Sequence, residues 1–319
     1  MRSRPDILVL GGGGVLGEAW MTGLLAGLEG GAGVDLRRCE YFVGTSAGSI
    51  VAARLAAGQS PRGPSDLRDA WAEPDERASP SMRRRALALA REAGDWAVAL
   101  SAPVVSLSLA ATASGGALTR AAALRAIGRG SMSLDQLQHQ VTRMKVRFDG
   151  RLRIVAVNRG NGRRVVFGRP SSPSASVGAA VAASCSVPWL FAPVRIGGVE
   201  YVDGGVWSPT NLDAAPAGRG SEVLCLNPTA SLTGAGGLLT GAGGLLAGAR
   251  ITSRSLVALE AAALRRRGAT VRVISPDPAS AGEMGWNLMS SEPSGRVLEA
   301  GYRQGRRLAG RSSRSLTGR

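Results

Sequence analysis

The sequence predicts an α/β protein in which short buried strands alternate with helices. Its 319 residues, 44% of them apolar, suit one large α/β domain or two small ones, with ample mass for a buried core. Ile7 to Leu10 is a short apolar run bounded by glycines, which is typical of a buried parallel strand. Tyr41 to Val43 is a second such run. Each leads into a glycine-containing turn that opens a helical pattern.

Periodicity and turn residues predict the other elements. Trp20, Leu24 and Leu28 repeat at i+4 and indicate one helix, and a second helix follows Gly48 as far as Gly58. Further strands are expected at 152–157, 163–167, 195–196, 199–202, 222–226 and 270–274, and further helices at 82–92, 175–183, 250–267 and 296–308. Asn161-Gly162 and Gly197-Gly198 lie between neighbouring strands and predict two hairpins.

Three segments differ in composition from the rest. We interpret residues 60–130 as a helical insertion that acts as a cap over the site, and residues 311–319 as a basic disordered tail. Residues 231–249 form a Gly/Leu-rich segment, in which Thr233 to Leu239 is repeated without change at Thr240 to Leu246. This segment is either a flexible surface loop or a mobile flap whose leucine pairs dip into lipid.

The chain is strongly basic, with 39 Lys and Arg against 23 Asp and Glu, and a formal net charge of +16. Codon bias is one explanation of such a composition, because GC-rich codons favour Arg, Ala and Gly together. The charge nevertheless attracts anionic membranes or nucleic acid. Zinc-finger spacing and an aromatic-rich RNA-binding signature are both missing from the sequence, so we expect lipid and no nucleic acid as the partner.

Cysteine and histidine counts exclude other classes of site. The three cysteines, at 39, 185 and 225, are odd in number and widely spaced, which predicts a reducing compartment without a disulfide framework. His139 is the single histidine, so sites that bind a metal through several histidines are excluded. We therefore expect no metal, and any Ser-His-Asp triad would depend on His139.

Membrane-spanning segments are not expected. The longest candidate, residues 96–113, is interrupted by Pro103 and several serines. The apolar run at Ile7 is shorter than the core of a signal peptide. We expect a cytoplasmic protein and leave open a peripheral association with the membrane.

Gly44-Thr-Ser46-Ala-Gly48 fits the nucleophile elbow, in which a serine lies on a tight strand-to-helix turn. The flanking glycines relieve crowding around the strained serine backbone. The motif alone is weak in a chain so rich in Gly and Ser, but here an apolar strand precedes it and a helical pattern follows. The alternative is a plain glycine turn with a helix-capping serine.

Gly11 to Gly17 also follows a strand and opens a helix, so its backbone N–H groups point toward an anion. These amides would form an oxyanion hole, or Gly12, Gly14 and Gly17 would bind a dinucleotide as GxGxxG. The third interpretation is a plain glycine turn. The dinucleotide alternative needs an acidic residue at the end of the next strand. Asp35 and Glu40 instead precede that strand, which favours the oxyanion hole.

Asp203-Gly204-Gly205 follows the strand that ends at Val202 and could bring a carboxylate to a serine on another strand. The alternative is an ordinary Asp-Gly turn. His139 lies among polar residues and fits a solvated helix position better than a catalytic base. Without it, Asp203 must accept the serine proton directly, which requires apolar surroundings because an ordinary aspartate, with a pKa near 3.9, is a weak base.

The blocks GGGGVLG, GTSAG and DGG occur in this order, with the segment Ala183 to Pro193 before the last. Together they resemble the patatin-like phospholipases over roughly residues 6–215. The resemblance implies a single three-layer α/β/α domain over residues 1–310, with a mainly parallel central sheet. It also implies lipid acyl hydrolysis by a Ser-Asp dyad without metal or nucleotide, and hence no cofactor.

Carried across residue by residue, the resemblance implies that Ser46 is the nucleophile and Asp203 its base. Gly12, Gly13 and Gly14 would supply the oxyanion hole, and Gly44, Gly48, Gly204 and Gly205 would support the elbow and the dyad. The sequence departs from the family twice: Leu16 stands where a basic residue is usual, and the Asn and Pro that normally follow DGG are rearranged as Pro209-Thr-Asn211.

The sequence therefore predicts a serine hydrolase acting on lipid esters, phospholipids among them, with an anionic membrane surface as a second partner. Two alternatives remain open, a dinucleotide-dependent oxidoreductase and a catalytically silent lipid-binding protein of the same fold. The head group, the acyl position, the acceptor and the oligomeric state are left undetermined.

Overall fold

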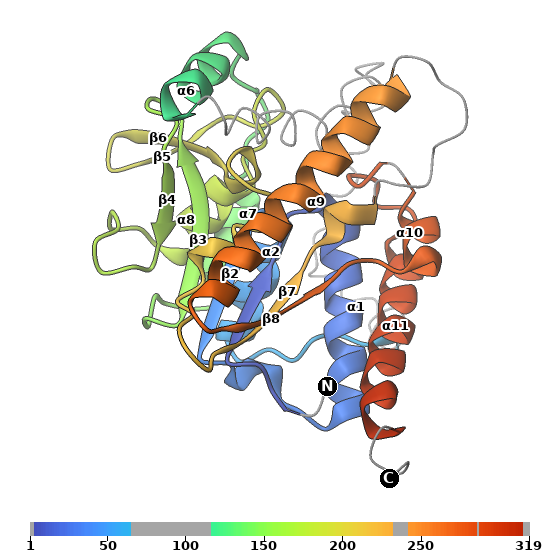
Figure 1. Cartoon of the computed structure of the whole chain (residues 1–319). Helices are drawn as coiled ribbons and strands as arrows, with labels where there is room; N and C mark the ends of the chain where they lie inside the picture. Colours follow the sequence, from blue (N-terminus) through green and yellow to red (C-terminus); the bar gives the residue numbers. More distant parts are fainter. Residues whose placement is uncertain (1–2, 65–115, 232–241, 286, 315–319) are drawn as a thin grey trace.

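A computed structural model describes residues 3–64, 116–231, 242–285 and 287–314 and is built around an eight-stranded sheet (Figure 1). The strands lie in the order β5-β6-β3-β2-β1-β7-β8, and β4 also pairs with β3. Their bounds are β1 Ile7–Leu10, β2 Tyr41–Thr45, β3 Leu152–Asn158, β4 Arg164–Phe167, β5 Val194–Ile196, β6 Val199–Asp203, β7 Glu222–Leu226 and β8 Thr270–Ile274. All strands predicted from the sequence are present.

The centre of the sheet is parallel and its β5 side is antiparallel. β1 lies between β2 and β7, and the β2–β3 and β7–β8 pairs are also parallel. The two predicted hairpins form the β3–β4 and β5–β6 antiparallel pairs, and β6 also runs antiparallel to β3. In the second hairpin Gly197 and Gly198 both have positive φ, as its two-residue turn requires.

Helices cover both faces of the sheet, which gives the three-layer α/β/α architecture expected (Figure 1). The helices are α1 Gly14–Ala32, α2 Ala47–Ala56, α6 Gly116–Ala126, α7 Asp135–Arg143, α8 Val177–Ser184, α9 Ala242–Arg266, α10 Pro278–Met284 and α11 Ser294–Arg314. α1, α2, α7 and α8 share one core cluster, whereas α9 packs in the cluster on the opposite face. None of the helices in the described ranges is long and apolar enough to cross a membrane.

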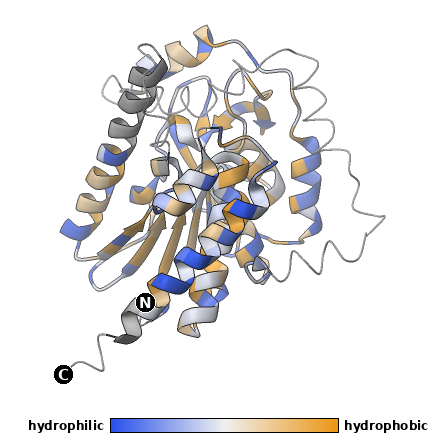
Figure 2. Ribbon diagram, turned by 90° about the vertical axis from the view of Figure 1, so that its right-hand side faces the viewer, coloured by the Kyte–Doolittle hydropathy of each residue, from blue (hydrophilic) through white to orange (hydrophobic). Residues whose placement is uncertain are grey.

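Burial on both faces explains why the strands read as continuous apolar runs. Leu8 and Leu10 of β1 belong to one core cluster, and Ile7 and Val9 belong to the other. Figure 2 shows the strands coloured as hydrophobic along their length. A strand with helices on both sides needs apolar side chains at every position rather than at alternate ones.

α1 and α11 pack backbone against backbone through glycines. A Cβ on Gly23 would lie 2.0 Å from the carbonyl oxygen of Leu298, and one on Gly27 would lie 2.2 Å from that of Tyr302. Trp20 of α1 is buried in this interface and donates its indole N–H to Gln304 of α11 at 2.9 Å. The C-terminal helix is therefore an integral part of the layer that carries α1.

Two segment predictions need correction. The Gly/Leu-rich loop predicted at 231–249 is helical from Ala242, where α9 begins, because alanine and leucine favour helix and the segment continues directly into a long helix. The tail predicted at 311–319 is helical to Arg314, since α11 extends beyond Gly310. Most of the predicted insertion, residues 65–115, lies outside the described residues, as do residues 232–241 and 315–319.

Candidate active site

The site forms where two strands meet end to end along one edge of β3. β4 pairs with one edge of β3 from Ile154 to Val157, so β2 and β6 both pair with the opposite edge of β3. β2 ends with Thr45 opposite Val155, and β6 ends with Asp203 opposite Ala156. The ends of two strands that are far apart in the chain are thereby placed side by side, and Ser46 follows directly after Thr45.

Ser46 occupies the tight turn between β2 and α2. Its backbone has φ 51° and ψ −125°, a strained conformation for a residue with a side chain. A Cβ on Gly48 would lie 2.0 Å from the carbonyl oxygen of Leu10, and one on Gly44 would lie 2.5 Å from Cα of Ser49. Both predicted elbow glycines are therefore needed for α2 to pack against the ends of β1 and β2.

Ser184 holds the elbow from behind and was not predicted. Its hydroxyl donates to the carbonyl of Val155 at 2.6 Å and accepts from the N–H of Ser46 at 2.9 Å. The side chain is fully buried at the end of α8. Ser184 thus fills the gap between the ends of β2 and β6 and satisfies two backbone groups there. In the sequence it is one serine among many, without a motif of its own.

Asp203 is buried at the end of β6 and faces Ser46. The N–H of Gly205 donates to its carboxylate at 2.6 Å, and the Ser46 hydroxyl lies close enough to favour the ionised form. Burial raises the pKa of the Asp203 carboxyl to about 6, while the Ser46 hydroxyl and the N–H of Gly205 act in the opposite direction. A Cβ on Gly204 would lie 2.4 Å from the carbonyl oxygen of Val155, so the turn after Asp203 requires glycine.

The glycine block after β1 lies against Ser46. A Cβ on Gly12 would lie 3.3 Å from Cβ of Ser46, and a Cβ on Gly14, whose φ is +59°, would lie 2.7 Å from the carbonyl oxygen of Leu288. The N–H of Gly12 donates to the carbonyl of Pro209 at 2.8 Å. Within the described part of the chain, those of Gly13 and Gly14 make no hydrogen bond. Of the three predicted oxyanion donors, Gly12 therefore has its N–H engaged with Pro209.

A cavity of about 180 Å³ opens onto Ser46, Asp203 and the glycine block. Aliphatic, aromatic and thioether side chains dominate its walls, which include Val15, Ile50, Leu134, Leu137, Val187, Phe191, Leu288 and Met289. Glu18 is the second carboxylate at the wall and is paired with Arg54 at 2.6 Å. The cavity is therefore suited to a hydrocarbon chain next to the serine.

The structure shows what Leu16, the first departure from the family pattern, does in this protein. Its side chain is fully buried, and its N–H donates to the carbonyl of Leu288 at 3.0 Å. The position that is usually basic therefore contributes to the core beneath the 288–289 segment. Leu16 is itself not among the residues that line the cavity.

The structure separates His139 from the site. His139 is exposed on α7, its Nδ1 lies 2.7 Å from the carbonyl oxygen of Asp135, and it is not among the cavity residues. The described residues also contain no group of three His, Cys, Asp or Glu side chains placed to hold a metal ion. At the end of β2, where a dinucleotide fold needs an acidic residue, Thr45 is buried instead.

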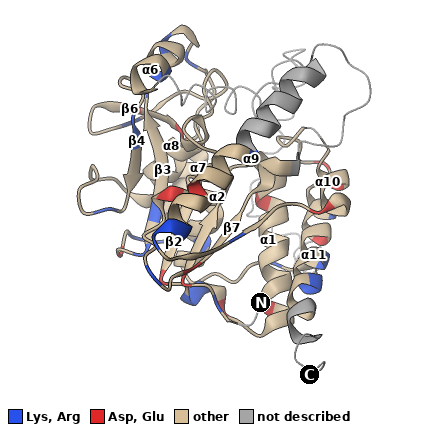
Figure 3. Cartoon of the chain, viewed as in Figure 1, with Lys and Arg blue, Asp and Glu red and all other residues tan. Residues whose placement is uncertain are grey.

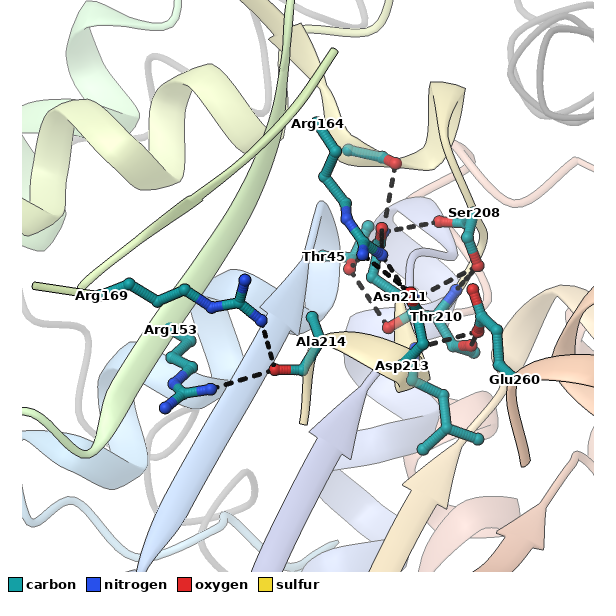
Figure 4. Close-up of polar contacts among 12 residues, drawn as sticks. Thr45, Arg153, Arg164, Arg169, Ser208, Thr210, Asn211, Asp213, Ala214 and Glu260 are labelled. Carbon is teal, nitrogen blue, oxygen red and sulfur yellow. Dashed lines mark hydrogen bonds and ion pairs between the residues drawn. The ribbon is translucent and has the colours of Figure 1, made fainter. Parts of the chain in front are cut away.

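The loop after Asp203 is held by Asn211 (Figure 4). The side-chain amide of Asn211 donates to Thr45 Oγ1 at 3.1 Å, to the carbonyl of Gly204 at 3.2 Å and to that of Ser208 at 2.8 Å. One buried residue thus connects the end of β2 with the turn after Asp203. The rearranged Asn and Pro of the sequence were the signal for this loop, but its contacts could not be derived from them.

Glu260 of α9 and Arg164 of β4 hold the same loop from two sides (Figure 4). One carboxylate oxygen of Glu260 accepts from Thr210 Oγ1 at 3.0 Å and from the N–H of Leu212 at 2.9 Å. Arg164 contacts both carboxylate oxygens of Asp213, at 2.5 and 2.7 Å.

Burial and the neighbouring Asp213 raise the pKa of Glu260 above its usual range. Burial also opposes ionisation of Asp213, but the hydrogen bonds and charge of Arg164 hold its pKa below the ordinary value. The pair therefore favours a single negative charge on Asp213, compensated by Arg164.

Comparison with known proteins gives one family. The family model described as "Patatin-like phospholipase" matches residues 8–216, which is more than half of the chain. Among solved structures, the crystal structure of VipD from Legionella pneumophila is similar, with a TM-score of 0.42 and 14% sequence identity over 97% of this chain and 67% of that chain. No curated protein matches the sequence.

Proposed function

Because the chain belongs to the patatin-like phospholipase family, whose members are lipid acyl hydrolases, we propose that it cleaves carboxylic esters of lipids by a Ser46-Asp203 mechanism. The observation that carries the proposal is the placement of Ser46 beside the buried Asp203 carboxylate on the wall of one cavity, together with glycine N–H groups that make no hydrogen bond within the described residues. A strained serine on a strand-to-helix turn supports it further.

In the first step, Oγ of Ser46 attacks the ester carbonyl carbon and its proton passes to the carboxylate of Asp203. The oxyanion that forms accepts hydrogen bonds from the N–H groups of Gly13 and Gly14, at the N-terminus of α1. The C–O bond to the alcohol then breaks, and the alcohol leaves with the proton held by Asp203. Ser46 remains acylated.

In the second step, Asp203 accepts a proton from water, and the resulting hydroxide attacks the acyl carbon. The same two amides hold the second oxyanion, and its collapse releases the fatty acid and returns the proton to Ser46. Each step is a proton transfer or an acyl transfer between groups of the chain, substrate and water, so none requires a cofactor or metal.

The raised pKa of Asp203 makes this carboxylate a better base than an ordinary aspartate. Near pH 7 it is still mostly ionised, as a base must be. The apolar cavity walls favour an acyl chain as the group bound next to Ser46. We propose phospholipid as the substrate class. We also propose that the protein is cytoplasmic and meets this substrate at an anionic membrane surface.

The test measures fatty-acid release from phospholipid vesicles and from a soluble short-chain ester. Ser46→Ala and Asp203→Ala are expected to lose at least about a thousandfold in kcat/KM on both substrates. His139→Ala is the matched control and is expected to retain wild-type rates, since His139 lies outside the cavity. Loss of activity in His139→Ala alone would contradict the dyad.

The catalytically silent lipid-binding alternative predicts a different outcome. In that case wild type and Ser46→Ala would release no fatty acid from either substrate above the buffer rate, while both would still bind vesicles. Hydrolysis by wild type that Ser46→Ala lacks excludes this alternative.

A further inference from the structure

A second, larger hollow lies apart from the Ser46 cavity and is lined by arginines. This surface cleft, of about 570 Å³, is formed by α6, the loop after β3 and the β5–β6 hairpin. Its lining includes Arg125, Arg129, Arg159 and Arg195, and Glu200 is the single acidic residue among them. We call it the arginine cleft.

The charges in the arginine cleft do not balance. Arg129 contacts both oxygens of Glu200, at 2.8 and 3.0 Å, and Arg195 lies 3.3 Å from the same carboxylate. Arg159 is 3.6 Å away and also donates to the carbonyl of Leu124, while Arg125 donates to that of Gly160. One carboxylate thus serves three guanidinium groups and the fourth has only a carbonyl, which leaves a surplus of three positive charges among the lining residues.

Three of the four arginines are exposed, Arg125 among them. The side chains of Arg129 and Arg195 are 61% and 68% exposed, whereas Arg159 and Glu200 are 15% and 19% exposed. Figure 3 shows basic residues on α6 and at the neighbouring strand ends. The half-buried Glu200 holds the guanidinium groups of Arg129 and Arg195 side by side. Their N–H donors are thereby preorganised to bind a phosphate group.

The arginine cleft lies at the same edge of the sheet as the Ser46 site. Residues 158–161 of its lining begin with the last residue of β3, which is parallel to β2, and Ser46 follows the carboxyl end of β2. β6 carries both Glu200 and Asp203, three residues apart, which places their Cα atoms about 10 Å from each other.

The short segment after Arg129 connects the two hollows directly. Met132 exchanges backbone hydrogen bonds with Leu190 and Ala192, on either side of the cavity residue Phe191. The backbone that follows Arg129 of the arginine cleft thus pairs with the segment that carries Phe191 of the Ser46 cavity.

Apolar side chains beside the charges favour a bilayer as the partner. Leu118 of α6 is 84% exposed, and Val199, which lines the arginine cleft, is 36% exposed. Exposed aliphatic groups next to clustered arginines are the combination that binds at the interface of an anionic membrane.

We propose that the arginine cleft binds the phosphate groups of an anionic phospholipid bilayer and thereby sets the Ser46 cavity against the membrane surface. The proposal rests on the proposed function for its biological sense, but its test does not require hydrolysis.

The test measures binding to vesicles of phosphatidylcholine with and without phosphatidic acid, using Ser46→Ala protein so that lipid is not consumed. Arg129→Gln with Arg195→Gln is expected to lower the partition coefficient on anionic vesicles roughly tenfold to thirtyfold, since each basic residue near such a surface contributes about fivefold. The matched control is Arg296→Gln with Arg303→Gln on α11, which removes two arginines of similar exposure, 66% and 57%, each paired with one glutamate.

Glu200→Gln provides a test in the opposite direction. Removing the one carboxylate adds positive charge to the arginine cleft, so binding to anionic vesicles is expected to become several-fold tighter. If Glu200 had a purely structural role, Glu200→Gln would bind anionic vesicles as well as or more weakly than the protein with Glu200.

Equal losses in the cleft and control variants, or equal binding to neutral and anionic vesicles, would overturn the proposal. Inorganic phosphate that binds the arginine cleft in a protein unable to bind vesicles would overturn the membrane assignment. The rate of soluble-ester hydrolysis separates the two proposals. Cleft variants made with Ser46 intact are expected to keep the wild-type rate. If the proposed function is wrong, wild type itself does not hydrolyse the ester.

Discussion

The N–H of Gly12 donates a hydrogen bond of 2.8 Å to the carbonyl of Pro209. This contact joins the glycine block after β1 to the loop that follows Asp203. The same loop carries Asn211, which donates to Gly204 and Thr45. Both halves of the proposed dyad and the proposed oxyanion donors are therefore held by one loop, and Arg164 and Glu260 anchor that loop from opposite sides.

The ionisation of Asp203 should govern the acid side of the pH profile. Because only the carboxylate accepts the serine proton, kcat/KM on a soluble ester is expected to fall about tenfold per pH unit below about pH 6, where the pKa of Asp203 lies. Stopped-time assays between pH 4.5 and 8 measure this limb. A profile flat down to pH 4.5 would assign the base to another group.

The buried charge of Asp203 should also lower stability. An unfolded aspartate has a pKa near 3.9, so between about pH 4 and 6 the folded chain retains a proton that the unfolded chain has lost. The free energy of unfolding therefore falls as the pH rises through this window.

Asp203→Asn removes this penalty and is expected to be about 1–3 kcal/mol more stable than wild type at pH 8, yet little different at pH 4. Urea unfolding at the two pH values is the measurement. An equal gain at both would contradict the electrostatic origin.

Replacing Ser46 by glycine should raise thermal stability, because it relieves the backbone strain at this position. Ser46→Gly and Ser46→Ala both remove the hydroxyl beside Asp203, but only glycine relaxes the backbone strain at φ 51° and ψ −125°. Such strain costs about 1–3 kcal/mol, against roughly 0.5–1 kcal/mol for the greater flexibility of unfolded glycine. Ser46→Gly is expected to exceed Ser46→Ala by about 1 kcal/mol in thermal unfolding, and equal stabilities would show that the turn is unstrained.

Arg164 should be essential for the loop behind the dyad. Arg164→Leu leaves Asp213 without its cation beside the buried Glu260, at a cost somewhat below the roughly 3–5 kcal/mol of a fully buried pair, since Asp213 keeps 31% exposure. We also expect kcat to fall with little change in KM, because Asn211 loses its support while the cavity walls stay in place.

The double variant Arg164→Leu with Asp213→Asn is the control for charge. Removing the stranded carboxylate is expected to restore part of the stability lost in Arg164→Leu, as a double-mutant cycle measures. If the two effects simply add, the ion pair is not what holds the loop.

Local patterns were enough to predict much of this protein. The apolar runs at Ile7 and Tyr41 and the glycine pairs of the hairpins specify strands and turns, because burial on both faces and positive φ restrict which residues fit. The blocks around Gly12, Ser46 and Asp203, taken in order, were sufficient to indicate the family. The extents of α9 and α11 were misjudged because Gly and Arg there suggested loops, whereas neighbouring helix-forming residues continue the helices.

Only the tertiary structure decided how the site is assembled. β2 and β6, which are far apart in the chain, meet opposite Val155 and Ala156 because β4 occupies the other edge of β3. Ser184 and Glu260 carry no motif, since a buried hydroxyl or carboxylate is recognisable only by the partners that surround it. Sequence patterns report the conformation of neighbouring residues, whereas the pKa of Asp203 and the occupied amide of Gly12 arise from burial and contacts that exist only once the chain has folded.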